Sequence, residues 1–216
     1  MNKLHKIIAA SLLASATTAG SGIALAESPL TANVGVTSNY MWRGMTQASD
    51  ISAVSGGIDY AHASGAYVGT WVSSLDGGQQ EMDLYAGYGF DAGPVGLDVG
   101  YISYMYPIGA AQLDFSEVYV NATFNVLKAG IAVTTSKESG TLEDDTYMYI
   151  GADVEVKKGL TLGLTYGDYD FEAAGADYSH YQLSLSKGDF TFAIDDTDVA
   201  NSDARYSVSW SHSLDL

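Results

Sequence analysis

Apolar and polar residues alternate along almost the whole chain after Thr31. In 160–167 the even positions are Leu or Tyr and the odd positions are Thr or Gly, and 95–101 repeats this with the parity reversed. A period of two is typical of a strand with one apolar face, and glycine inside these segments would be costly in a helix. The pattern predicts twelve strands, at 31–40, 53–61, 66–74, 80–90, 95–105, 114–124, 128–136, 146–155, 160–167, 178–186, 190–195 and 205–215.

The connections between these segments alternate in length. Five are tight, at 62–65, 91–94, 125–127, 156–159 and 187–189, and those between them are mostly longer, as at 135–145, 168–177 and 196–203. Short turns on one side, long loops on the other and an even strand count are typical of outer-membrane barrels. We therefore expect an all-β, transmembrane, antiparallel up-and-down barrel of about twelve strands with both termini in the periplasm.

A soluble β-sandwich would also give alternation, with its apolar face turned inward. Two features favour the barrel. The polar face is rich in Gly and Ser, which suits a crowded lumen better than a solvated surface, and a sandwich needs no alternation of loop length. The last segment, 206–214, also resembles the closing strand of such barrels, although the chain ends in Leu216 instead of an aromatic residue.

The first 26 residues have the features of a signal peptide. Lys3 and Lys6 precede an apolar stretch, Ile7–Ala16, that is too short to span a bilayer, and the small residues Ala24–Ala26 suit a cleavage site. The expected division is a signal peptide at 1–26 and an outer-membrane barrel at 27–216. Its partners would be outer-membrane lipid, lipopolysaccharide and the barrel-assembly machinery.

Charge narrows the classes of partner. Removing 26 of the 216 residues takes away Lys3 and Lys6, so 7 basic residues face 26 acidic residues and the formal charge becomes −19. Nucleic acids and anionic membrane surfaces attract positive proteins, so neither is an expected partner. The chain has no cysteine, so no disulfide contributes to its stability.

The sequence predicts neither an enzyme nor a cofactor. No Gly-x-Ser-x-Gly element occurs, and the parity of the strands separates His180 on the lumen side from His212 on the lipid side. The acidic loop 196–203 does not match the twelve-residue calcium loop, so no metal ligand is assigned.

Several blocks together resemble one bacterial family. ANVGVTSNYMWRGMTQ, AVSGGIDYAHASGAYVGTWVSS, EMDLYAGYGF and LDVGYISYMYP, followed by DFSEVYV, occur in this order and spacing. They resemble the TorF family of proteobacterial porins over nearly the whole chain after the leader. The resemblance implies an outer-membrane barrel with a channel role, and it brings no substrate and no residue roles.

Strand parity predicts which side chains line the lumen. Carried through 31–40, it turns Arg43 inward near the outer mouth, where carboxylates of two other strands reach the same level. An unpaired charge there would be costly, and Arg can form a two-pronged pair with a carboxylate. This set is either a charged constriction that selects permeants or a structural ion pair: Arg43, Glu81, Asp83 and Glu117.

The same parity places a second charged set lower in the lumen: Asp59, Asp98, Lys128, Asp153 and Glu155. It also assigns an outer aromatic girdle to Tyr40, Trp42 and Trp210. Acidic rings favour cations. The sequence therefore predicts a cation-favouring, porin-like channel for small solutes, and the alternative is a closed barrel whose acidic outer loops bind an external partner.

Overall fold

The computed structural model of the chain describes residues 29–108, 113–139 and 144–216. The predicted signal peptide, 1–26, lies outside the described residues. In the described part of the chain, no helix has the length and apolar character needed to cross a bilayer.

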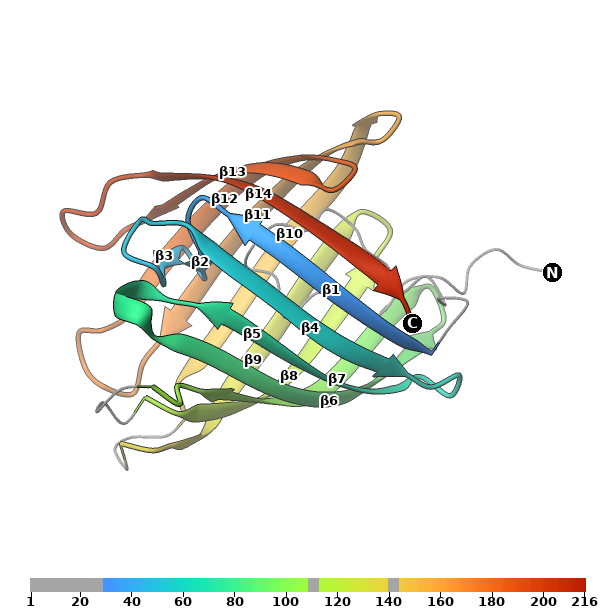
Figure 1. Cartoon of the computed structure of the whole chain (residues 1–216), viewed down its shortest axis with the longest axis horizontal. Coiled ribbons are helices and arrows are strands. Elements are labelled where there is room, and N and C mark those ends of the chain that lie inside the picture. The colour runs from blue at the N-terminus through green and yellow to red at the C-terminus, as the bar shows by residue number, and fades with distance from the viewer. Residues whose placement is uncertain (1–28, 109–112, 140–143) are drawn as a thin grey trace.

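Twelve antiparallel strands close into one barrel, as predicted (Figure 1). Each strand pairs with its neighbours in chain order, and β1 completes the circle by pairing with both β14 and β4. The closure is confirmed, and the sandwich alternative is wrong because the twelve strands form one closed sheet without edges. The strands are β1 (Leu30–Thr37), β4 (Ala53–Ala61), β5 (Ala66–Ser74), β6 (Gln80–Ala92), β7 (Val95–Met105), β8 (Phe115–Phe124), β9 (Leu127–Lys137), β10 (Thr146–Lys157), β11 (Leu160–Asp170), β12 (Tyr178–Lys187), β13 (Phe190–Thr197) and β14 (Arg205–Asp215).

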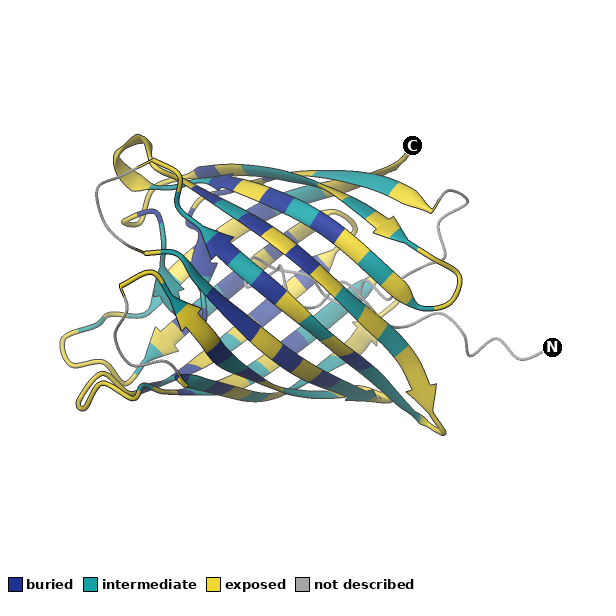
Figure 2. Ribbon diagram, turned by 90° about the horizontal axis from the view of Figure 1, so that it is seen from below, coloured by how far each residue is buried: buried dark blue, intermediate teal, exposed yellow. Residues whose placement is uncertain are grey.

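Burial alternates along the strands (Figure 2). Ile150, Leu164 and Val208 are each more than half exposed on the outer surface, whereas Asp83 and Glu117 are almost fully buried inside. A globular core would reverse this arrangement. The outside is therefore an aliphatic surface, and the polar and charged side chains line the enclosed interior.

The two ends of the barrel differ. β1 begins and β14 ends at the same end, which also carries the tight turns (Figure 1). The opposite end carries the longer connections, including a short 3₁₀ turn at Asp76–Gly78. The first of these connections forms a two-stranded hairpin of β2 (Met41–Trp42) and β3 (Met45–Thr46), which we call the inner hairpin.

The first strand is shorter than its alternation predicts. It was expected to reach residue 40, but β1 ends at Thr37 and the chain bends at Ser38, whose backbone N–H donates to the carbonyl of Val208. Beyond this bend the inward and outward parity of β1 no longer applies. The residues that follow enter the lumen.

Candidate functional site

The inner hairpin turns at Arg43 and Gly44, which both have positive φ, 48° and 80°. Two such residues in a row are characteristic of the tightest hairpin turns. The turn also touches the barrel wall: a Cβ on Gly44 would lie 2.5 Å from Cβ of His180 and 2.9 Å from Cγ2 of Thr197. The tip of the hairpin therefore rests against β12 and β13.

The Arg43 side chain crosses to β8 and pairs with Glu117. Nη1 lies 2.8 Å from Oε1 and Nη2 lies 2.6 Å from Oε2, and the two side chains are 5% and 0% exposed. Burial alone would lower the pKa of Arg43, but the Glu117 carboxylate outweighs it and the net pKa is raised. The guanidinium also lies over the rings of Trp42 and Tyr147, 4.2 and 4.1 Å from their centroids. The tip is thus held by a charged, two-pronged pair between aromatic faces.

Glu81 on β6 fixes the base of the inner hairpin. It accepts a hydrogen bond from the Tyr40 hydroxyl at 2.7 Å and another from the Tyr106 hydroxyl at 3.0 Å. Burial first, and then the Glu81 charge, raises the pKa of both phenols, which therefore remain neutral donors. Asp83, the next inward residue of β6, has one oxygen, Oδ1, without a hydrogen-bond partner among the described residues.

Arg43, Glu81, Asp83 and Glu117 therefore all lie inside the barrel, where parity places them. The structure brings Arg43 and Glu117 into contact. Glu81 instead accepts hydrogen bonds from two tyrosines, and Asp83 forms neither an ion pair nor a tyrosine hydrogen bond with the described residues.

The fit of Gly44 against the wall gives a test of hairpin packing. Gly44→Ala should destabilise the folded barrel more than Gly175→Ala, because both glycines have nearly equal φ, 80° and 85°, but a Cβ at 175 meets no described atom within 4 Å. Backbone strain costs about 1 kcal/mol in both variants, and overlap with His180 adds about 1–3 kcal/mol only at Gly44. Urea unfolding in lipid vesicles measures both values. Equal losses would show that the tip is not packed against β12.

A second set of carboxylates lies lower in the lumen, and tyrosines hold them. Asp59 accepts from the Tyr85 hydroxyl, and Asp98 accepts from the Tyr67 hydroxyl at 2.7 Å. Glycine makes room for these rings: a Cβ on Gly87 would lie 2.2 Å from the Tyr67 oxygen. Sequence reasoning missed the tyrosines, although the inward parity of Tyr67 and Tyr85 was a usable signal.

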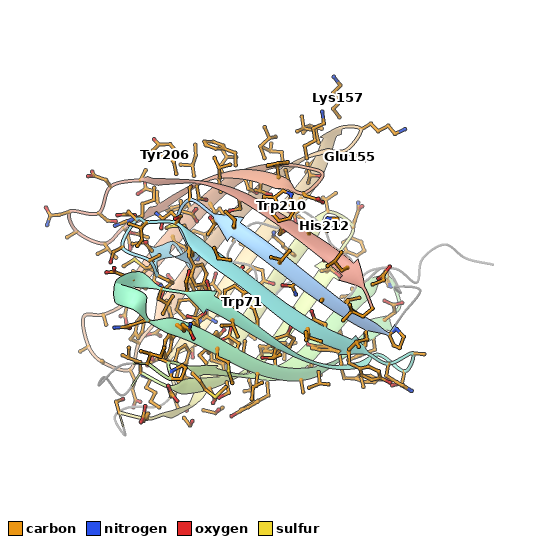
Figure 3. The ribbon with its side chains drawn as sticks, viewed as in Figure 1. Trp71, Glu155, Lys157, Tyr206, Trp210 and His212 are labelled. Atoms are coloured by element: carbon orange, nitrogen blue, oxygen red, sulfur yellow. The ribbon has the colours of Figure 1, made fainter. Side chains whose placement is uncertain are left out.

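Of the three other residues predicted for the lower lumen, two line it and one does not. Lys128 pairs with Asp153 at 3.0 Å, so both line the lumen as predicted. Glu155 does not. It is exposed, its Oε1 accepts the Gly159 backbone N–H at 2.7 Å, and Figure 3 places it with Lys157 at the end of the projecting β10–β11 hairpin. It shares the parity of Asp153, but the β10–β11 hairpin extends past β9, whose pairing with β10 ends at Ala152.

The predicted aromatic girdle is wrong for two of its three residues. Tyr40 is 3% exposed and packs on Trp71, with 5.5 Å between ring centroids. Trp42 lies inside the barrel and packs edge-to-face on Tyr104 and Phe115. Both follow the bend at Ser38, beyond which parity fails. Trp210 keeps its outward position on β14, where it stacks on His212 (Figure 3).

The two sides of the lumen differ in side-chain size. Large tyrosines line the wall on β5 to β8 and on β10 to the start of β12, the last being Tyr178, whereas from Ser184 through β13 and β14 short hydroxyl side chains are common inside: Ser184, Ser186, Thr191, Ser207 and Ser209. Two of their hydrogen bonds join adjacent strands, Ser186 with Thr191 and Ser209 with Thr37, each at 2.8 Å. The polar lining with the least bulk therefore runs along the second half of β12 and along β13 and β14.

Comparison with known proteins gives a family and a fold. A family model described as "Bacterial protein of unknown function (Gcw_chp)" matches residues 23–211. The solved KdgM porin is 11% identical, with a TM-score of 0.61 over 85% of this chain and 99% of that chain. The KdgM porin in complex with disordered oligogalacturonate is 10% identical, with a TM-score of 0.59 over 86% of this chain and 98% of that chain. No curated protein sequence matches the chain.

Proposed function

The chain belongs to the Gcw_chp family, bacterial proteins of unknown function, and because membership brings no activity with it we propose one from the lumen: a passive outer-membrane channel for small solutes. The observation that carries the proposal is the closed barrel with aliphatic residues outside and charged residues, such as Arg43 and Asp98, enclosed within. A lipid-facing exterior and a polar interior are what a pore through a bilayer requires.

Other observations support the same proposal. The KdgM porin shares the fold, and the sequence blocks resemble the TorF porins. In the proposed orientation both termini are periplasmic and the long connections face outward, toward lipopolysaccharide. Residues 1–26 would direct export, and the barrel-assembly machinery would insert the mature chain. A hydrolase has little support, because the inward His180 already contacts the Tyr147 hydroxyl through Nε2, at 2.9 Å.

The lumen is proposed to favour cations. Arg43 neutralises Glu117 and Lys128 neutralises Asp153. Five further inward carboxylates have no Lys or Arg partner among the described residues: Asp59, Glu81, Asp83, Asp98 and Asp195. A lumen of this sign concentrates cations and repels anions. We infer that the permeants differ from the acidic oligogalacturonate bound by the KdgM porin.

Ion selectivity in planar bilayers tests the function directly. Discrete conductance steps are expected, and in a roughly tenfold KCl gradient the reversal potential should have the sign of a cation-selective pore, because the unpaired carboxylates lie along the lumen. Anion preference would contradict the charge argument. Complete silence would contradict the channel.

The alternative is a closed barrel whose acidic loops bind an external partner, as an adhesin or receptor does. One observation favours it: the inner hairpin reaches across the lumen and is packed against the wall at Gly44. Absence of conductance, together with retained folding, would support this alternative.

A further inference from the structure

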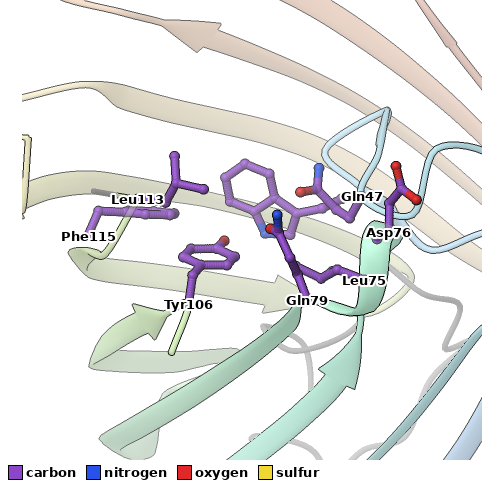
Figure 4. Close-up of a pocket in the computed structure, with 9 residues that line it drawn as sticks. Gln47, Leu75, Asp76, Gln79, Tyr106, Leu113 and Phe115 are labelled. Carbon is purple, nitrogen blue, oxygen red and sulfur yellow. The ribbon is translucent and has the colours of Figure 1, made fainter. Parts of the chain in front are cut away.

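A depression of about 460 Å³ lies at the end with the long connections (Figure 4). Tyr106 and Phe115 line one side of it, and Gln47, Asp76 and Gln79 line the other. Trp42 of the inner hairpin also contributes to the lining. Aromatic walls with a few convergent polar groups are the usual composition of a small-molecule site.

Some polar groups of the depression already form hydrogen bonds within the protein, and others, such as the Gln79 side-chain amide, have none among the described residues. The Ser49 hydroxyl donates to Asp76 Oδ2 at 2.7 Å, and the Gln47 amide nitrogen donates to the carbonyl of Met45 at 3.3 Å. The Tyr106 hydroxyl donates to Glu81. The Asp76 carboxylate is the one charged group of the lining, it can only accept, and Ser49 is its one hydrogen-bond donor among the described residues. A matching ligand should present N–H donors.

Charge and ring chemistry agree with this. The whole chain has a formal charge of −17, and Asp76 is exposed and has no Lys or Arg partner among the described residues. Aromatic faces attract ammonium groups and also accept aliphatic surface. One face of Trp42 is already covered by the Arg43 guanidinium, so Tyr106 and Phe115 supply the remaining ring surface.

We propose that this depression binds an organic ammonium ion, a cationic nitrogen on an apolar body, with Asp76 facing the nitrogen and the aromatic residues contacting the body. The inference rests on the proposed channel for its role, since a site at the outer mouth would concentrate such cations above the lumen. Gln47 and Trp42 belong to or directly adjoin the inner hairpin, so the ligand would lie on the segment that narrows the pore.

Calorimetric titration of the folded full-length chain tests the site, with empty detergent micelles as the blank and salt near 0.15 M to screen long-range attraction. The probes are cyclohexylmethylammonium and its neutral counterpart cyclohexylmethanol. Saturable binding of the cation at least roughly tenfold tighter than the alcohol is expected, because the alcohol offers one neutral O–H donor whereas the ammonium offers three N–H donors and a charge opposite to that of Asp76. Equal affinities, or no cation binding, would overturn the proposal.

Two matched variants locate the site. Asp76→Asn should weaken cation binding about five- to tenfold and leave the alcohol unaffected. Asp203→Asn, which removes the same charge from another exposed connection, should change neither. Equal losses in both variants would reduce the effect to general surface potential and overturn the site. Conductance is recorded separately: a conducting barrel without cation binding refutes only the site, and a silent barrel that binds the cation refutes only the channel.

Discussion

Arg43→Ala and Glu117→Gln are both expected to raise single-channel conductance several-fold. The Arg43–Glu117 pair is the charged attachment between the tip of the inner hairpin and β8, and it is almost fully buried. Removing one partner of a buried pair leaves the other charge uncompensated, at a cost of about 3–5 kcal/mol. Either variant should therefore release the hairpin tip from its closed position. Planar-bilayer recordings in about 1 M KCl, where surface charge is screened, measure the change.

The two variants also show whether the Arg43–Glu117 pair acts by holding the hairpin tip in place or only through its charge. If Arg43 acts only through its charge, Arg43→Ala should strengthen cation preference while Glu117→Gln weakens it, with little change in conductance. Lys128→Met is the matched control, since Lys128 pairs with Asp153 but holds no hairpin. It should shift ion preference and leave conductance nearly unchanged. If Arg43→Ala and Glu117→Gln change the ion preference in opposite directions and neither raises the conductance, the pair does not hold the hairpin tip closed.

The barrel could be predicted because the pattern that specifies each strand is contained within that strand. Each strand repeats a two-residue pattern, and outward residues such as Ile150 and Leu164 must be apolar wherever lipid is the solvent. The strands β4, β5, β7 and β14 have the predicted bounds. Closure follows from the same constraint, since an open edge has no hydrogen-bonding partner in hydrocarbon.

The site was less predictable, because it depends on where the pattern stops. Nothing in the alternation marks the bend at Ser38, so Tyr40 and Trp42 were assigned to the lipid face. Arg43 was assigned correctly to the lumen, but as a side chain of a strand wall. In the structure it lies in a turn with φ of 48°, and a positive φ in a residue other than glycine cannot be inferred from periodicity.

The tyrosines of the lower lumen show a different limit. Parity placed Asp59 and Asp98 inward but could not show which groups they meet on the next strand but one. Tyr85 on β6 donates to Asp59 on β4, and Tyr67 on β5 donates to Asp98 on β7. The partners are 26 and 31 positions apart in the sequence. Such pairings depend on the register and stagger of the closed sheet, which single segments do not encode.

Shortening the inner hairpin is expected to give the largest conductance of any variant. Tyr40 and Gln47 face each other at its base, where the Gln47 N–H donates to the Tyr40 carbonyl at 2.8 Å. Replacing residues 41–46 by Asn-Gly would close a tight turn at this point and keep the Tyr40–Glu81 hydrogen bond. The variant removes Arg43 and the contact of Gly44 with β12, so it should conduct more than Arg43→Ala in the same high-salt recordings.

The control variant shortens a connection outside the lumen by the same number of residues. Replacing residues 198–203 by Asn-Gly shortens an exposed connection by the same length and should leave the conductance steps unchanged, because the Val199 and Asp203 side chains in it lie on the surface. Circular dichroism and heat-dependent gel mobility confirm that both barrels fold. Larger steps only in the shortened inner hairpin identify it as the obstruction. If that variant folds and still gives no larger steps, the tyrosines of the lower lumen limit passage instead, and the inner hairpin is not the constriction.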